Sequence, residues 1–128
     1  IARIYNQGIE DRVATLETAL RSPEERAEWM AAKGPRHPVL VATDDGGSVL
    51  GWASLNAFNP RPAYDHVVDL SLYVAREHRG RGIGDALLSA LQVAFELRAL
   101  LQMIVKQALQ IFRIGSFHKF GPSGVDSC

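Results

Sequence analysis

The opening residues have the hydrophobic spacing of a helix. Apolar side chains recur at Ile1, Ile4, Tyr5 and Ile9, close to the 3.6-residue helical period. The helix is expected to end around Gly8, because glycine commonly terminates helices. The pattern starts in mid-helix, without an initiating methionine, a basic run or a cleavage site. We therefore expect no signal peptide and a missing natural N-terminus.

A second helix is predicted to begin at Pro23. Ser22 can cap it, proline suits the first helical position, and Glu25 completes a capping box. A Gly-Pro pair at residues 34–35 ends this helix. The segment 10–21 between the two helices has no clear pattern.

Strand-like runs then predict a hairpin and a third strand. Residues 39–42 and 49–55 flank the Asp-Asp-Gly-Gly run at 44–47, which is typical of a hairpin turn. The third strand, residues 66–74, alternates with period two. One of its faces carries Val67, Asp69, Ser71 and Tyr73.

A Gly- and Arg-rich loop at residues 76–84 leads into a further helix. The apolar stripe of that helix consists of Ile83, Leu87, Leu88, Leu91, Ala94 and Phe95. Residues 101–105 fit a strand or continued helix, and their β-prone Met-Ile-Val run favours a strand. Residues 110–120 fit a short last helix. The order of elements predicts a mixed α/β domain.

Composition and charge restrict the class of protein. The chain has 128 residues, 47% of them hydrophobic and 22% charged, an ordinary balance for one globular domain. Fourteen Lys and Arg offset fourteen Asp and Glu, so no overall positive charge favours nucleic acid. The single cysteine, Cys128, excludes an intrachain disulfide and a Cys/His metal cluster. We expect a soluble, cytoplasmic protein with no metal, nucleic-acid or membrane partner.

The loop at residues 76–84 has the features of an anion site. Gly80, Gly82 and Gly84 permit positive φ and let the backbone approach a ligand closely. The helix that follows adds free N–H donors and positive potential at its start. The loop also contains three arginines: Arg76, Arg79 and Arg81. Together these groups suit a phosphate or pyrophosphate.

Two common phosphate loops do not fit the spacing. A P-loop ends in Gly-Lys-Ser/Thr, whereas Ile83 and Asp85 follow the second and third glycines here. A dinucleotide fingerprint needs G-x-G-x-x-G directly after the first strand of a βαβ unit. Here the third glycine, Gly84, comes one position too early, and the loop follows a hairpin-rich region.

The spacing Arg79-x-x-Gly82-x-Gly84 resembles the R/Q-x-x-G-x-G/A motif of the GNAT superfamily of N-acetyltransferases. In that superfamily the loop and helix start hold the pyrophosphate of acetyl-coenzyme A. The Ser-Leu-Tyr-Val run before the loop and the Leu-Leu pair after it strengthen the resemblance. Further segments resemble the phosphinothricin acetyltransferase branch, namely residues 4–6, 15–18, 22–26, 61–64 and 68–74.

This resemblance implies a GNAT acyl-CoA N-acyltransferase fold, an α/β fold of the α+β type with a mixed sheet. It also implies an enzyme that uses acetyl-coenzyme A to acetylate the amino group of a small amino-acid-like substrate, such as phosphinothricin or methionine sulfoximine. A complete domain has one strand before the first helix and two after the last. We therefore expect residues 1–128 to form a single domain truncated at both ends. Many relatives pair, so a homodimer is expected.

The resemblance also implies roles for residues. Leu72, Tyr73 and Val74 match the strand that contacts the acetyl and pantetheine groups, with the Val74 N–H polarising the thioester carbonyl. Asp69 matches a glutamate that removes the amine proton, and a bridging water compensates for its shorter side chain. The alternative for Asp69 is a solvated strand carboxylate. The phosphate arm comprises Arg79, Gly80, Arg81, Gly82, Ile83, Gly84 and Asp85.

Substrate residues are expected in the loop before the third strand. Arg61 and Tyr64 can meet a carboxylate or phosphinate there, and arginine binds such groups bidentately. The alternative for both is an ordinary surface loop. By resemblance, Tyr5, Asn6 and Glu17 line the same cleft.

The last quarter of the chain departs from the family pattern. Gln110 stands where the family has an asparagine and can still bond coenzyme A, whereas Phe117 replaces a His or Tyr and cannot donate a proton. Two alternatives to the enzyme therefore stay open. One is a coenzyme A-binding module that has lost catalysis, and the other is an acetyltransferase of protein N-termini.

Overall fold

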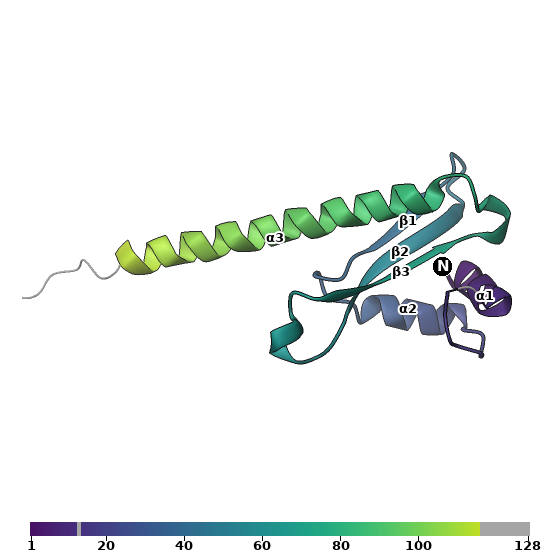
Figure 1. Ribbon diagram of the computed structural model, residues 1–128, viewed down its shortest axis with the longest axis horizontal. Coiled ribbons are helices and arrows are strands. Elements are labelled where there is room, and N and C mark those ends of the chain that lie inside the picture. The colour runs from purple at the N-terminus through teal and green to yellow at the C-terminus, as the bar shows by residue number, and fades with distance from the viewer. Residues whose placement is uncertain (13, 116–128) are drawn as a thin grey trace, which may run out of the picture. The chain divides into compact units, whose positions relative to one another are not determined.

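In the computed structural model, three antiparallel strands form a sheet that carries helices on both faces (Figure 1). The structure describes residues 1–12 and 14–115, with side chains as far as 101. The chain divides into two compact units, Ile1–Phe95 and Glu96–Cys128. All strands described here belong to the first unit.

The two predicted N-terminal helices are confirmed. They are α1 (Ala2–Asp11) and α2 (Pro23–Ala31). The capping box of α2 is formed as predicted. The N–H of Glu25 donates to Oγ of Ser22 at 3.1 Å, and the N–H of Ser22 donates to Oε2 of Glu25 at 2.7 Å.

Helix α1 runs past Gly8, where the sequence analysis ended it. Gly8 packs on the ring of Tyr73, and a Cβ at this position would lie 2.9 Å from ring atoms. The glycine therefore serves a close contact rather than a helix end. The helix stops instead at Arg12, whose φ of 54° is left-handed.

The predicted hairpin and third strand are present as β1 (Val39–Thr43), β2 (Val49–Ala57) and β3 (Val68–Val74), in the order β1-β2-β3. The hairpin turn is closed by the N–H of Gly47, which donates to the carbonyl of Asp44 at 3.0 Å. Gly47 has a φ of 83°, which explains glycine at this position.

The register places polar and aromatic residues of β2 and β3 on one face. Trp52 lies opposite Tyr73, and Asn56 lies opposite Asp69. The alternation predicted along β3 is therefore confirmed. Helices α1 and α2 lie on this face, where the buried core consists of Ile4, Tyr5, Ile9, Trp52, Tyr73 and Ala75.

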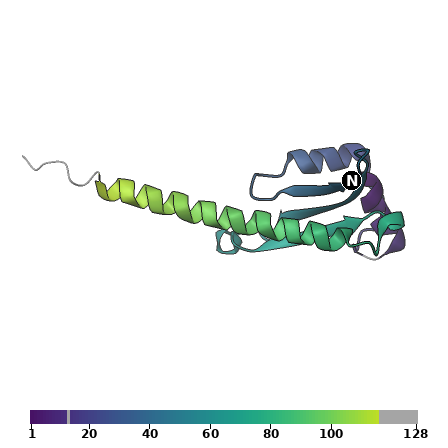
Figure 2. The same cartoon turned by 90° about the horizontal axis from the view of Figure 1, so that it is seen from above.

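The first turns of α3 (Ile83–Gly115) lie on the other face of the sheet (Figure 2). The buried core there consists of Ala53, Leu55, Leu87 and Leu91. The predicted stripe is too wide, since Leu88 is 46% and Phe95 38% exposed. Only the line of side chains that points directly at the sheet is covered.

The prediction of a strand at residues 101–105 is wrong. These residues belong to α3, as do residues 110–115 of the predicted last helix. No glycine or proline interrupts the chain between Gly84 and Gly115, and Leu, Ala, Gln and Glu favour helix throughout. Residues 116–120 lie outside the described part. No helix in that part is both long and apolar enough to cross a membrane.

Candidate active site

The loop after β3 forms a hollow at the start of α3. A short 3-10 turn, Arg76–His78, follows the strand, and the chain then passes through Gly80 and Gly82. The hollow has a volume of about 230 Å³. It is lined by Val74, His78, Arg79, Gly80, Gly82, Ile83, Gly84 and Asp85.

Two of the three loop glycines have the positive φ that was predicted, whereas Gly84 lies in α3 without one. Gly80 has a φ of 75° and Gly82 a φ of 82°, and no atom lies within 4 Å of where a Cβ would stand on either. The carbonyl of Gly82 accepts the N–H of Ala86, so the helix begins here. The first N–H groups of a helix have no acceptor within it and point outward. The backbone thus offers donors and room to an anion.

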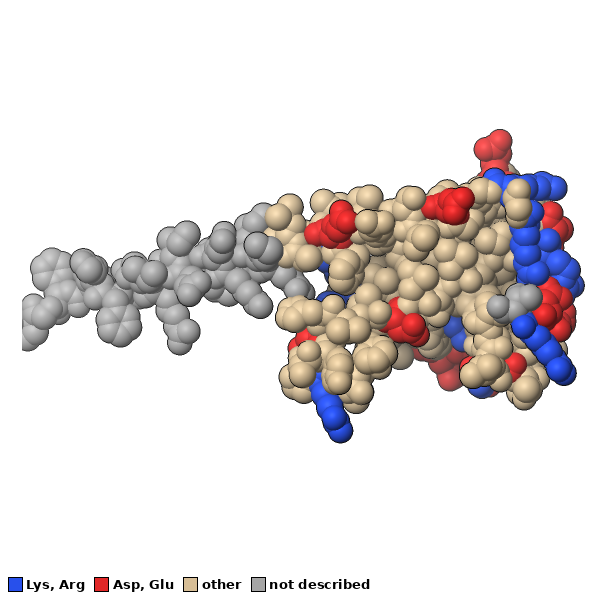
Figure 3. Space-filling view, in the orientation of Figure 1, with Lys and Arg blue, Asp and Glu red and all other residues tan. Residues whose placement is uncertain are grey.

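Two of the three loop arginines serve a structural role. Arg76 contacts both carboxylate oxygens of Asp11, at 2.8 and 3.0 Å, and Glu10 at 3.0 Å. Arg79 also contacts Asp11, at 2.9 Å. These bonds, Arg76 first, lower the pKa of Asp11. Basic and acidic side chains meet at this end of the first unit (Figure 3), and they join the loop to the end of α1.

Arg81 is the loop arginine that forms no ion pair with a described carboxylate and so stays available to an anionic ligand. Its Nη1 lies 3.5 Å from Nδ1 of His78, and no described carboxylate pairs with it. The expected positive charge of the loop is therefore reduced, because Asp11 neutralises part of it. Sequence reasoning missed Asp11, because it lies beyond the predicted end of the first helix, in the segment 10–21 that showed no clear pattern.

The outer edge of β3 offers backbone groups to a ligand. The N–H of Ala75 donates to the carbonyl of Leu50 in β2 at 2.8 Å. Since backbone groups alternate in an antiparallel pair, those of Tyr73 also face β2, whereas those of Leu72 and Val74 face outward. Nε of Arg79 donates to the outward carbonyl of Val74 at 3.2 Å. The Val74 N–H is thus on the side where the hollow lies.

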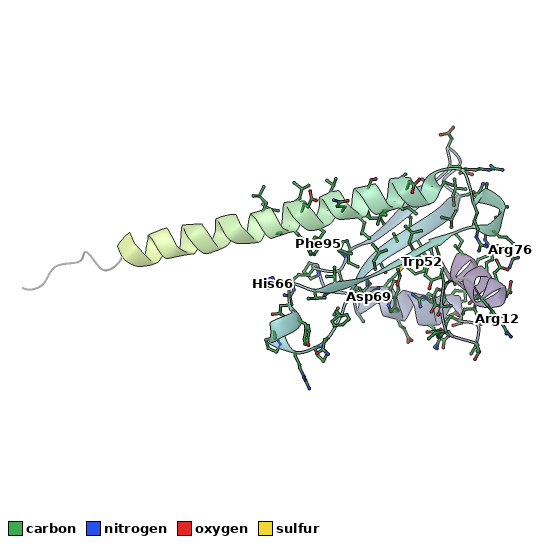
Figure 4. The ribbon with its side chains drawn as sticks, in the orientation of Figure 1. Arg12, Trp52, His66, Asp69, Arg76 and Phe95 are labelled. Atoms are coloured by element: carbon green, nitrogen blue, oxygen red, sulfur yellow. The ribbon has the colours of Figure 1, made fainter. Side chains whose placement is uncertain are left out.

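A larger cavity of about 650 Å³ lies on the face of the sheet that α1 and α2 cover. Asp69 lies on this face with Trp52 (Figure 4), and its Oδ1 accepts the N–H of Leu70 at 3.0 Å. The cavity is lined by Tyr5, Ala14, Thr15, Glu17, Arg26, Trp29, Trp52, Asn56, Asp69, Leu70, Ser71, Leu72 and Tyr73.

A hydrogen-bond network stiffens the wall beside Asp69. Nδ2 of Asn56 donates to Oγ of Ser71 at 3.1 Å, and Nζ of Lys33 donates to Oδ1 of Asn56 at 2.7 Å. Lys33 also donates to the carbonyl of Leu55 at 2.7 Å. Burial lowers the pKa of Lys33. Sequence reasoning missed this network.

The loop between α1 and α2 closes another side of the cavity. Asn6 holds this loop, because its side chain exchanges two 2.9 Å hydrogen bonds with the backbone of Arg21. Nε of Arg21 donates to Glu17 at 2.8 Å, which lowers the pKa of the Glu17 carboxyl. Tyr5 and Glu17 line the cavity, whereas Asn6 positions the loop that carries Glu17.

The family model for "Acetyltransferase (GNAT) family" matches residues 5–121 of the chain. The chain belongs to the GNAT acetyltransferase family. This agrees with the resemblance of the loop motif and with the mixed helix and strand architecture.

Individual GNAT proteins share sequence and fold with the chain. YwnH of Bacillus subtilis, provisionally named a phosphinothricin acetyltransferase, is 35% identical over 127 residues, which cover 94% of this chain and 78% of YwnH. The L-methionine sulfoximine/L-methionine sulfone acetyltransferase of Pseudomonas paraeruginosa is 35% identical, covering 71% of this chain and 54% of that protein.

A solved GNAT structure extends the comparison to the fold. The phosphinothricin acetyltransferase of Sinorhizobium meliloti, in complex with acetyl-coenzyme A, matches with a TM-score of 0.65 and 41% identity. The match covers 70% of this chain and 49% of that one. The chain thus spans about half the length of this structure and of the Pseudomonas relative.

The two substrate residues predicted in the loop before β3, Arg61 and Tyr64, do not line the large cavity of this GNAT chain. The loop before β3 contains a 3-10 turn, Pro62–Tyr64. Tyr64 packs against Phe58, with ring centroids 5.6 Å apart, beside a separate hollow of about 150 Å³. Arg61 is exposed. The side chain of Gln110 and all of Phe117 lie outside what the structure describes, so their roles stay predictions.

No metal site is evident in this GNAT chain as far as it is described. No group of three or more His, Cys, Asp or Glu side chains is gathered there in a way that could hold an ion.

Proposed function

We propose that this GNAT chain provides the core of an acetyl-coenzyme A-dependent N-acetyltransferase that acts on the amino group of a small amino-acid-like substrate. The observation that carries the proposal is the hollow at the start of α3, which adjoins the outer edge of β3 in the sheet of described strands. The cavity with Asp69 lies along the same strand. A phosphate-bearing cofactor and an amine can therefore reach β3 together.

The chain's own residues support each requirement of acetyl transfer. Bound acetyl-coenzyme A supplies the acetyl group as a thioester. The N–H groups at the start of α3, together with Arg81, suit its pyrophosphate. The outward N–H of Val74 can donate to the thioester carbonyl oxygen as negative charge develops on it.

Asp69 takes the proton in this proposal. As the amine nitrogen bonds to the carbonyl carbon and the carbon–sulfur bond breaks, the proton passes to the Asp69 carboxylate, directly or through one water. The electron pair of the broken bond leaves with the sulfur. The exposure of Asp69 and its position in the cavity wall leave room for such a water.

The substrate class follows from the relatives. The names of the Bacillus and Sinorhizobium proteins specify phosphinothricin, and that of the Pseudomonas protein specifies methionine sulfoximine and methionine sulfone. A cavity of about 650 Å³ suits molecules of this size. We also propose a cytoplasmic homodimer, the arrangement that the family resemblance implies. Light scattering of the purified chain would test the dimer.

An acetyl-transfer assay tests the proposal. With acetyl-coenzyme A at neutral pH, we expect thioester consumption that depends on phosphinothricin or methionine sulfoximine. Coenzyme A bound without turnover of any amine would favour the binding module. Turnover of peptide N-termini alone would favour a protein acetyltransferase, and failure to bind coenzyme A by calorimetry would refute all three.

Replacement of Gly82 by alanine should weaken coenzyme A binding. Its φ of 82° strains any residue with a Cβ, although no atom obstructs the added methyl. The strain costs about 1–2 kcal/mol, so we expect the dissociation constant to rise by about 5- to 30-fold as the loop relaxes. Gly34→Ala is the control, because that position is open and has no positive φ. Equal calorimetric affinities for both variants would contradict this role of the loop.

A further inference from the structure

Arg26 has an unusual place in the large cavity. It extends from α2 and, among the described residues that line the cavity, is the one lysine or arginine. Its guanidinium carbon lies 4.0 Å from the ring centroid of Trp29, 4.4 Å from that of Tyr5 and 5.7 Å from that of Trp52. Aromatic rings thus surround the guanidinium of Arg26 at the cavity.

The aromatic rings hold the charge but leave its hydrogen-bond donors without acceptors. A guanidinium that stacks on rings keeps its N–H groups in its own plane, where they can bond an anion. Nε of Arg26 is shielded from solvent and has no hydrogen-bond partner. This donor is out of reach of a ligand as well as of water, so an anion in the cavity would meet the guanidinium at Nη1 and Nη2, which form no hydrogen bond with a described residue.

The carboxylates nearby are engaged elsewhere. Glu17 is bonded by Arg21 at 2.8 Å, and Oδ1 of Asp69 accepts the N–H of Leu70. No described carboxylate forms an ion pair with Arg26. Burial lowers the pKa of Arg26, and Tyr5 and Glu17 oppose that shift. Arg26 is therefore a cation that feels Glu17 at longer range but forms no ion pair with a described carboxylate, in a cavity large enough for an amino acid.

We propose that Arg26 binds the carboxylate of the amino-acid substrate, an inference that rests on the proposed acetyl transfer. A carboxylate presents two oxygens in one plane and matches the two-pronged edge of a guanidinium. The same charge repels an ammonium group, so the amine is directed to the part of the wall that holds Asp69. The cavity thereby recognises both ends of an α-amino acid. This assigns to Arg26 the role that sequence reasoning gave to Arg61.

The test compares methionine sulfoximine with its carboxamide, which keeps the amine but lacks the carboxylate charge. In the presence of coenzyme A, calorimetry on the full chain should show at least about 10-fold tighter binding of the acid. In Arg26→Gln the affinity for the acid should fall by about 10- to 100-fold, the effect of one lost bond to a charged group, with the carboxamide unchanged. Arg26→Lys should recover part of the loss, since it keeps the charge without the planar fork.

Arg61→Gln is the matched control and should bind the acid as the wild type does. Coenzyme A affinity and the thermal unfolding midpoint, measured on each variant, separate substrate recognition from damage to the fold. If Arg26→Gln does not fold, the test is the affinity for the acid compared with that for the carboxamide, measured on the wild type and on Arg26→Lys. The inference is overturned if the wild type binds the acid and the carboxamide with equal affinity. It is also overturned if Arg26→Gln weakens the binding of both equally, or if Arg61→Gln rather than Arg26→Gln weakens the binding of the acid. Carboxylate binding through Arg26 without acetyl transfer would refute only the proposed activity.

Discussion

Asp69→Asn is expected to lower kcat for acetyl transfer by about 100-fold or more at neutral pH, the usual contribution of a general base. Asparagine keeps the size of the side chain and can still accept the N–H of Leu70 that Asp69 accepts at 3.0 Å. It cannot take up the proton that the amine loses. Coenzyme A affinity should be unchanged, because the hollow at the start of α3 does not include Asp69.

Steady-state rates with a small amino-acid substrate at neutral pH check this expectation. Asp69→Glu should retain much of the activity, because the carboxylate is kept. Asp45→Asn, in the exposed hairpin turn, is the matched control. If the Asp69→Asn enzyme were as fast as the control, Asp69 would not be the general base, and the alternative of a solvated strand carboxylate would hold.

Trp52→Ala is expected to lower the free energy of unfolding by about 3–5 kcal/mol, the usual cost of deleting a fully buried aromatic side chain. Trp52 is 1% exposed. Its ring stacks on Tyr73 at 4.9 Å between centroids and meets Trp29 edge-on at 5.6 Å. Removing it would leave a void between the sheet and both N-terminal helices, and part of the cavity wall would be lost.

Trp52→Phe separates packing from hydrogen bonding. Nε1 of Trp52 is shielded from solvent and has no hydrogen-bond partner, so phenylalanine gives up no bond there. We expect it to cost less than half of what alanine costs, because most of the ring contacts stay. Urea unfolding of the two variants beside the wild type provides the comparison. Similar midpoints for Trp52→Ala and Trp52→Phe would disprove this account of the aromatic core.

Local signals along the chain predicted the elements that depend on neighbouring residues. The capping box at Ser22 and Glu25 is formed, and the hairpin turn lies where the Asp-Asp-Gly-Gly run placed it. The predicted helix end at Gly8 failed because of a distant residue, since Gly8 lies inside α1 and packs on Tyr73. The predicted strand at 101–105 failed for a local reason, because the neighbouring Leu, Ala, Gln and Glu favour helix and no Gly or Pro ends it.

The candidate site also has one part that the sequence predicted well and one part that it predicted poorly. The spacing of Arg79, Gly82 and Gly84 was sufficient to predict a glycine loop that opens a helix, because backbone freedom and the helix start are properties of consecutive residues. The large cavity was predicted only in part. Asp69 and Glu17 line it as expected, whereas Arg61 and Tyr64 lie apart from it.

The sequence by itself determined the family, the phosphate-type loop and the face of β3 that carries Asp69. Only the tertiary structure decided which arginines are free to bind a ligand. Arg76 and Arg79 share Asp11, more than sixty positions away, whereas Arg26 is held among aromatic rings and forms no ion pair with a described carboxylate. The physical reason is that a charge attracts whatever lies within a few ångströms of it, and that neighbourhood exists only once the chain has folded.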